Sequence, residues 1–182
     1  DEKVQDAIHQ FDLKGNYVGK VIKIGEGPGM VKNISDFFPT GDSFEVLESL
    51  GDVSKILVFD RDYVLKKEIQ LGYLASSFGK LGQHTYAASG SYNLPFVQHR
   101  LVLMDREGKR MAEFLPNEYK NQMLPMTEKN FNRHKDRVFF HEIFNPVAYE
   151  VERDSLLPRF QFDFGNYGIP KKFWEVDIMQ GF

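Results

Sequence analysis

Short apolar runs alternate with polar turns along the whole chain, and no long segment repeats its apolar residues at helical spacing. Residues 160–164 (FQFDF) alternate strictly between apolar and polar, and residues 56–59 (ILVF) are β-branched and aromatic. Both patterns are typical of β-strands. Residues 117–130 carry Pro125 in their middle and are expected to form a long connection. The pattern therefore predicts an all-β protein.

One sequence unit occurs four times along the chain. Each copy has an apolar run, an acidic residue, a short polar turn and a second apolar run. The acidic residues are separated by 48, 45 and 47 residues, and they are Asp12, Asp60, Asp105 and Glu152. Glycine stands three residues after Asp12 and Asp105, as in a type I turn whose first side chain accepts backbone hydrogen bonds. Each unit therefore predicts a β-hairpin, with the acids as turn residues rather than metal ligands.

Two further strand candidates lie between successive hairpins. They are residues 33–38 and 43–48, 76–81 and 84–89, and 130–134 and 137–144. Four antiparallel strands in about 47 residues are typical of β-propeller blades, whose known repeats run ~40–50 residues. We expect a single domain over residues 1–182, with a hairpin at 8–24, blades at about 31–71, 76–116 and 129–164, and the start of a further blade at 171–179. The alternative fold is a β-sandwich, which also has short strands and frequent turns.

A glycine-rich segment, residues 24–31 (IGEGPGMV), has the outward form of a phosphate-binding loop. A dinucleotide-binding motif would need G-x-G-x-x-G at the start of a helix, and a P-loop would need G-K followed by Ser or Thr. Here Pro28 has no backbone N–H, and residues 30–38 (MVKNISDFF) have a strand pattern. The segment is therefore predicted to connect two blades, with glycines that supply unusual backbone angles.

Residues 11–29 (FDLKGNYVGKVIKIGEGPG) resemble the start of the six-bladed, NHL-like β-propeller proteins common in Bacteroidetes. Members of that family typically carry FD-x-x-G-x-F/Y, a strand, and then G-x-G-P-G-E. Met30 stands here where the family usually has glutamate, and residues 58–71 (VFDRDYVLKKEIQL) also match the family style. The resemblance covers essentially the whole chain. It implies a periplasmic or cell-surface location, because family members are usually exported and often lipid-anchored.

The length of the chain does not suffice for six blades. Six units would need about 280 residues, and the chain has 182. Three arrangements fit this length: part of a six-bladed ring, a ring assembled from two copies, or a small four-bladed ring in which the two ends of the chain share a blade. We expect part of a ring, whose open strand edges favour self-association.

The composition narrows the classes of partner. The net charge is −3 without a basic stripe, so nucleic acid is not expected as a partner. There is no cysteine, which excludes disulfides, thiolate metal sites and cysteine nucleophiles. No apolar run approaches the ~18 residues of a transmembrane segment. Residues 1–10 (DEKVQDAIHQ) lack the apolar core of a signal peptide, so if the protein is exported, its signal is expected to have been removed already or to lie outside this chain.

Candidate binding residues follow from the propeller geometry rather than from a motif. The five histidines form no H-x-x-x-H pair, and there is no G-x-S-x-G, so we expect no metal and no cofactor. Propeller ligands usually lie over the central channel, near the innermost strands. This position favours Asp36, Phe38, Arg133 and His134 as ligand-binding candidates. Trp174, the single tryptophan, could stack on a sugar ring.

The function expected from these observations is non-catalytic binding of a glycan, a peptide or a protein of the cell envelope. It rests on the resemblance and on the absence of catalytic motifs, because a fold alone does not establish a function. One alternative is a propeller enzyme, a lyase or hydrolase with a polar or metal-bound central channel. The other alternative is a purely structural scaffold within an envelope complex.

Overall fold

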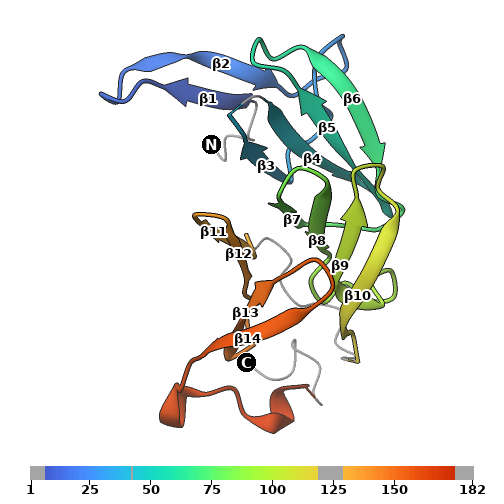
Figure 1. The fold of residues 1–182 in the computed structure, drawn as a ribbon, viewed down its shortest axis with the longest axis vertical. Helices are drawn as coiled ribbons and strands as arrows, with labels where there is room; N and C mark the ends of the chain where they lie inside the picture. Colours follow the sequence, from blue (N-terminus) through green and yellow to red (C-terminus); the bar gives the residue numbers. More distant parts are fainter. Residues whose placement is uncertain (1–6, 42, 119–128, 175–182) are drawn as a thin grey trace.

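A computed structural model of the protein describes residues 7–41, 43–118 and 129–174. These residues form a two-stranded hairpin and three four-stranded antiparallel sheets, arranged in an arc (Figure 1). Two short 3-10 helices, η1 (Gly165–Tyr167) and η2 (Lys171–Trp174), are the helical elements of the described residues. The expected all-β fold with blade-like four-stranded sheets is therefore confirmed. No helix in the described part of the chain is long and apolar enough to span a membrane.

The strands of each sheet follow one another in chain order, and each pairs with its neighbours in sequence. The hairpin consists of β1 (Ala7–Phe11) and β2 (Tyr17–Lys23). The first sheet contains β3 (Asp36–Pro39), β4 (Phe44–Leu50), β5 (Val53–Phe59) and β6 (Leu65–Gln70). The second contains β7 (Ser77–Leu81), β8 (Thr85–Ser89), β9 (His99–Asp105) and β10 (Arg110–Pro116). The third contains β11 (Phe131–His134), β12 (Arg137–Phe140), β13 (Val147–Val151) and β14 (Leu156–Gln161).

The aspartate turns are built alike in three of the four repeats. In each turn the Oδ1 atom accepts hydrogen bonds from the backbone N–H groups two and four residues ahead, at 2.8–3.0 Å. These acceptors are Asp12, Asp60 and Asp105. The turn after Glu152 is different, because its backbone N–H donates to the carbonyl of Ser155. The interpretation of the acids as turn residues that accept backbone hydrogen bonds is therefore confirmed for Asp12, Asp60 and Asp105.

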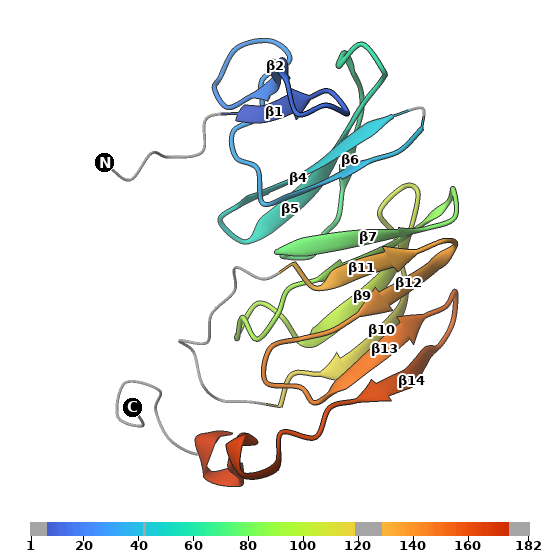
Figure 2. The same ribbon diagram turned by 90° about the vertical axis from the view of Figure 1, so that its left-hand side faces the viewer.

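The sheets stack face to face, so the second sheet is covered on both faces (Figure 2). Along β9, Val102 and Met104 pack toward the first sheet, whereas Leu101 and Leu103 pack toward the third. This division follows from the two-residue period of a strand, which points successive side chains to opposite faces. Strands buried on both faces lose the apolar–polar alternation of a half-exposed sheet. The continuous apolar run of β9 is the result.

The first strand of each sheet lies on the inner side of the arc, and the fourth lies on the outer side (Figure 1). The inner strand β7 contacts both of its neighbours in the arc, β3 and β11. Gly79 of β7 marks the closest approach, because a Cβ atom there would lie 2.9 Å from the ring of Phe131. The absence of a side chain at Gly79 therefore lets the second and third sheets meet at the inner edge.

The glycine-rich segment connects the hairpin to the first sheet, as the sequence predicts. Gly25 N–H donates to the carbonyl of Val31 at 2.9 Å, and Met30 N–H donates to that of Gly27 at 3.1 Å. Gly29 has a φ of 73°, which favours glycine. Residues 30–35 do not join a strand beyond the isolated bridge of Ile24 with Val31, so the strand pattern of residues 30–38 is realised only from Asp36.

Two strand predictions are wrong in their extent. The strand expected at 137–144 ends at Phe140, because the next residues turn toward the second sheet and Glu142 binds a side chain there. The strand expected at 171–179 does not begin at 171: residues 171–174 form η2, and Phe173 N–H donates to the carbonyl of Pro170. Residues 175–179, and most of the connection expected at 117–130, lie outside the described residues. The grouping of the chain into one partial domain stays a prediction.

Candidate functional site

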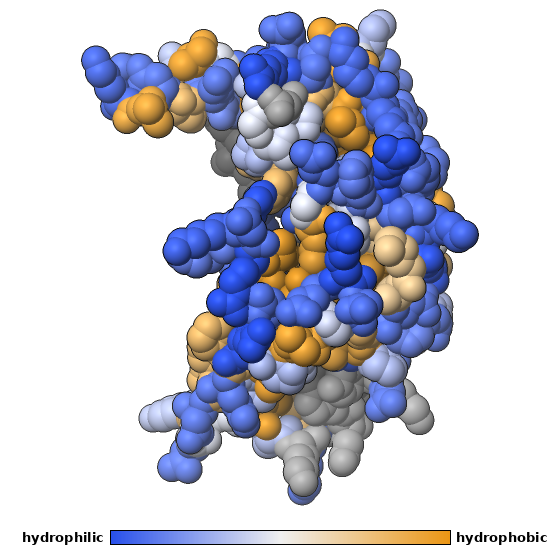
Figure 3. Space-filling model, viewed as in Figure 1, coloured by the Kyte–Doolittle hydropathy of each residue, from blue (hydrophilic) through white to orange (hydrophobic). Residues whose placement is uncertain are grey.

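The structure brings three of the five candidate residues together at the inner edge of the arc. Asp36, Phe38 and Arg133 line a small cavity of about 130 Å³ between β3, β7 and β11. Beside these strands, apolar surface is visible in the hollow of the arc between hydrophilic projections (Figure 3). His134, at the end of β11, is exposed and does not line the cavity. Trp174 ends η2, and its side chain lies outside the described part of the structure.

Asp36 ties the first sheet to the second at this cavity. Its Oδ2 atom accepts a hydrogen bond from Phe78 N–H at 3.1 Å, and its Oδ1 atom accepts one from Phe37 N–H at 2.9 Å. Burial raises the pKa of Asp36, while these N–H groups and Lys129, with Nζ 3.6 Å from Oδ1, act in the opposite direction. The guanidinium of Arg133 lies 6.0 Å from the ring centroid of Phe38. The inner-edge residues therefore contact one another across three strands.

A larger cleft, of about 1080 Å³, lies between the second and third sheets. It is bounded by the β8–β9 loop, by the β12–β13 loop and by the segment that follows β14. Six aromatic side chains line it: Tyr92, Phe144, Tyr149, Phe162, Phe164 and Tyr167. The polar and charged residues of the lining are Arg100, His141, Asn145, Gln161 and Asp163. Apolar walls with a few polar groups are typical of ligand-binding pockets.

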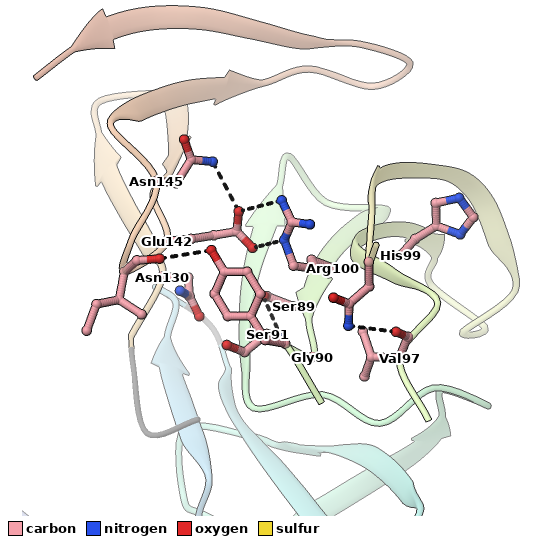
Figure 4. A network of polar contacts seen from close by, with 12 residues as sticks. Ser89, Gly90, Ser91, Val97, His99, Arg100, Asn130, Glu142 and Asn145 are labelled. Carbon is pink, nitrogen blue, oxygen red and sulfur yellow. Dashed lines mark hydrogen bonds and ion pairs between the residues drawn. The ribbon is translucent and has the colours of Figure 1, made fainter. Parts of the chain in front are cut away.

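A buried ion pair beside this cleft joins strand β9 of the second sheet to the loop between β12 and β13 of the third (Figure 4). Arg100, in β9, donates through Nε to Glu142 Oε1 at 2.8 Å, and a terminal nitrogen lies 3.3 Å from Oε2. The residues are 5% and 1% exposed. The guanidinium also donates to the carbonyl of Pro116 at 2.8 Å and lies 5.0 Å from the ring centroid of Tyr92. Arg100 is thus held by charge, hydrogen bonds and an aromatic face.

The loop that carries Glu142 is fixed by further hydrogen bonds. Asn145 donates to Glu142 Oε2 at 3.2 Å, and Tyr92 Oη donates to the carbonyl of Ile143 at 2.9 Å. The Nε2 atom of His141 lies 3.0 Å from the carbonyl oxygen of Asn145, which accepts its hydrogen. The loop between β12 and β13 is therefore held in one shape against the second sheet.

Unfavourable backbone conformations gather around the same cleft. Ser91, Leu115 and Phe144 have φ values of 53°, 56° and 64°. Left-handed conformations of non-glycine residues cost of order 1–3 kcal/mol each and tend to cluster at functional sites. Buried oxygen atoms of Ser91 and Asn117 also lack a hydrogen-bond partner among the described residues. The neighbourhood of the cleft therefore carries features that stability alone does not favour.

An exposed aromatic row extends the cleft along the segment after β14. The rings of Phe162 and Phe164 lie 6.2 Å apart at an interplanar angle of 27°, and His141 contacts Phe162 edge-on at 5.5 Å. Phe162 is 45% exposed, Phe164 55% and Tyr167 94%. We call Phe162, Phe164 and Tyr167 the aromatic ledge. Within residues 7–41, 43–118 and 129–174, no three His, Asp or Glu side chains are placed to hold a metal ion.

The cleft residues did not stand out in the sequence. In the sequence, Glu142 is noticeable only as a charged residue within a largely apolar segment. Arg100 is noticeable only as a charged residue directly before the apolar run of β9. Neither signal identifies a partner, because the two residues are 42 positions apart. The stacking of two sheets is what brings them together.

Comparison with known proteins finds one matching family model and a similar crystal structure. The family model described as "Domain of unknown function (DUF4934)" matches residues 1–178. The crystal structure of a "Putative exported protein" from Bacteroides fragilis NCTC 9343 is similar, with a TM-score of 0.71 and 20% sequence identity. The match covers 84% of this chain and 44% of that protein, so this chain spans less than half of its length. No curated protein sequence gives a significant match.

Proposed function

We propose that this chain, which belongs to the DUF4934 family of domains of unknown function, binds a ligand without chemically changing it. We further propose that it forms part of a six-bladed, NHL-like β-propeller of the cell envelope. Supporting observations are the inner-to-outer strand order of each sheet, the face-to-face stacking of the sheets, and the fold likeness to a protein named as exported.

The N-terminal hairpin supports an incomplete ring. Its Asp12 turn has the same hydrogen bonds as the Asp60 and Asp105 turns, which join the third and fourth strands of the first and second sheets. By this equivalence, β1 and β2 are the third and fourth strands of a further blade. The edge of β1 that has no partner strand among the described residues would then pair with strands from elsewhere, either another part of the protein or a second copy.

The main observation in favour of a binding function is the Arg100–Glu142 pair beside the aromatic cleft, in which both carboxylate oxygens already accept hydrogen bonds. General acid–base catalysis needs a group within reach of the substrate that can give or take a proton. Here both oxygens of Glu142 accept hydrogen bonds from Arg100 or Asn145, and His141 is bonded to the loop backbone. These contacts hold the shape of the cleft. A pre-shaped, apolar cleft with few polar groups favours binding.

A ligand screen with cleft variants tests this function. Glycans and peptides from the cell envelope are screened by thermal shift, and hits are measured by calorimetry with wild type, Phe164→Ala and Tyr167→Ala. The matched control is Tyr17→Ala, which removes an exposed aromatic ring on the hairpin. We expect the cleft variants to lose affinity, the control to retain it, and the ligand to be recovered unchanged by mass spectrometry. Conversion of the ligand, or equal binding by all variants, would contradict the proposal.

A further inference from the structure

We infer that the cleft binds an uncharged oligosaccharide, with sugar rings packed on the aromatic ledge. This inference rests on the proposed binding function and adds the chemical class of the ligand. Three properties of the cleft lead to it: the exposed ledge, the balance of charge in the lining, and the amide groups beside the aromatic rings.

The aromatic ledge is exposed to solvent. Phe162 and Phe164 lie between β14 and η1, and their stacked rings, with centroids 6.2 Å apart, lie on the same side of the chain. Tyr167 follows in η1. Exposed aromatic faces are unfavourable in water and are typical of surfaces that become covered by a partner. The face of a pyranose ring carries C–H groups, which an aromatic face attracts because its π-system is electron-rich.

The charge of the lining disfavours an acidic ligand. Arg100 is the one lysine or arginine among the described residues that line the cleft, and Glu142 holds its guanidinium. The cleft also contains Asp163, whose Oδ1 atom accepts a hydrogen bond from Gly165 N–H at 2.8 Å. A uronate or phosphate entering this cleft would lose hydration without gaining an unengaged cation. An uncharged ligand avoids that loss.

The polar side chains of the lining match hydroxyl groups. Gln161 contributes an amide, which can both donate and accept hydrogen bonds, as sugar hydroxyls do. The amide of Asn145 is a second such group, which also donates to Glu142 Oε2 and accepts from Val147 N–H. The cleft volume of about 1080 Å³ lies slightly above the ~300–1,000 Å³ typical of ligand pockets. It therefore suits several linked sugar units better than a single one.

The test compares neutral and acidic hexasaccharides on the whole 182-residue chain. Cellohexaose, mannohexaose, maltohexaose and hexagalacturonate are titrated by calorimetry into wild type, Phe164→Ala, Tyr167→Ala and the control Tyr17→Ala. We expect a neutral hexasaccharide to bind tightest, and each ledge substitution to weaken it up to about tenfold, the scale of one aromatic contact. Affinity should not change between low and high salt, because no ligand charge is screened.

The outcomes separate this inference from the proposed function. Tighter binding of hexagalacturonate than of every neutral hexasaccharide would overturn the inference and leave the binding function intact. If an envelope peptide binds in a ledge-dependent way and no neutral sugar binds, the inference is likewise overturned and the binding function stays intact. If neither sugars nor peptides bind in a ledge-dependent way, both the inference and the proposed function fail.

Discussion

The guanidinium of Arg100 and the carboxylate of Glu142 meet across two sheets, 2.8 Å apart and both almost fully buried. The two residues are 42 positions apart in the sequence, so the pair forms only because the second sheet packs against the third. Arg100 itself lines the cleft, and Glu142 holds it there from the loop between β12 and β13. The stability of the fold and the shape of the candidate site are therefore linked at this point.

Removal of one partner of this pair should be strongly destabilising. Arg100→Met leaves the buried carboxylate of Glu142 without its cation, and breaking a buried ion pair in this way costs ~3–5 kcal/mol. The double variant Arg100→Met/Glu142→Leu should lose less than the sum of the single variants, because no buried charge is left unpaired. Urea denaturation measures each free energy of unfolding. Additive losses would show that the pair does not act as a unit.

The stability of the protein should fall in acid through Glu150. Hydrogen bonds from Arg137, and then from Arg159, lower the pKa of Glu150 from 4.5 to about 2. A carboxylate with a depressed folded pKa stabilises the fold above its unfolded pKa. That contribution is lost as the pH falls from about 4.5 toward 2. Glu150→Gln should therefore lower the melting temperature at neutral pH and reduce its decrease between pH 4.5 and 2.

The matched control for this prediction is Glu118→Gln, which removes a carboxylate at an exposed position outside the strands. We expect its melting temperature to follow the same pH profile as wild type. A Glu150→Gln profile that runs parallel to wild type through the acid range would refute the assigned role of Glu150.

Two equivalent turn glycines should differ in their tolerance of alanine. Gly15 and Gly108 have φ values of 86° and 84°, so alanine is strained at both by ~1–2 kcal/mol. A Cβ atom at Gly15 would meet nothing within 4 Å, whereas at Gly108 it would lie 2.2 Å from the carbonyl oxygen of Gln70. Gly108→Ala should therefore be the more destabilising, by about 1 kcal/mol or more, in urea denaturation. Equal losses of stability in the two variants would mean that the Gly108 turn of the second sheet does not pack against Gln70 of the first sheet.

The open edge of the hairpin should make the chain self-associate. Phe11, Tyr17 and Val18 are exposed on β1 and β2, and β1 pairs with β2 on one side only within the described residues. Light scattering on a sizing column should show a mass that rises with protein concentration. Phe11→Lys and Val18→Lys should reduce the association, because charged edge residues oppose strand pairing. A particle of single-chain mass at every concentration would contradict this prediction.

Local features of the sequence determined the strands and their turns. Apolar–polar alternation and the Asp12, Asp60 and Asp105 turns depend on neighbouring residues, so they could be recognised without a structure. The repeat of about 47 residues then indicated four-stranded units. The propeller geometry placed Asp36 and Arg133 near the innermost strands, and both residues line one cavity. Their role in binding a ligand stays a prediction.

Tertiary structure alone decided the composition of the larger cleft. Arg100, its partner Glu142 and the aromatic ledge come from separate segments, and no periodicity or motif joins them. Strand β12 also ends at Phe140, before the end of the apolar sequence pattern, because the chain turns there and Glu142 binds Arg100. Strand patterns arise from contacts between near neighbours in sequence. The cleft arises from the stacking of whole sheets, which brings together residues that are far apart along the chain.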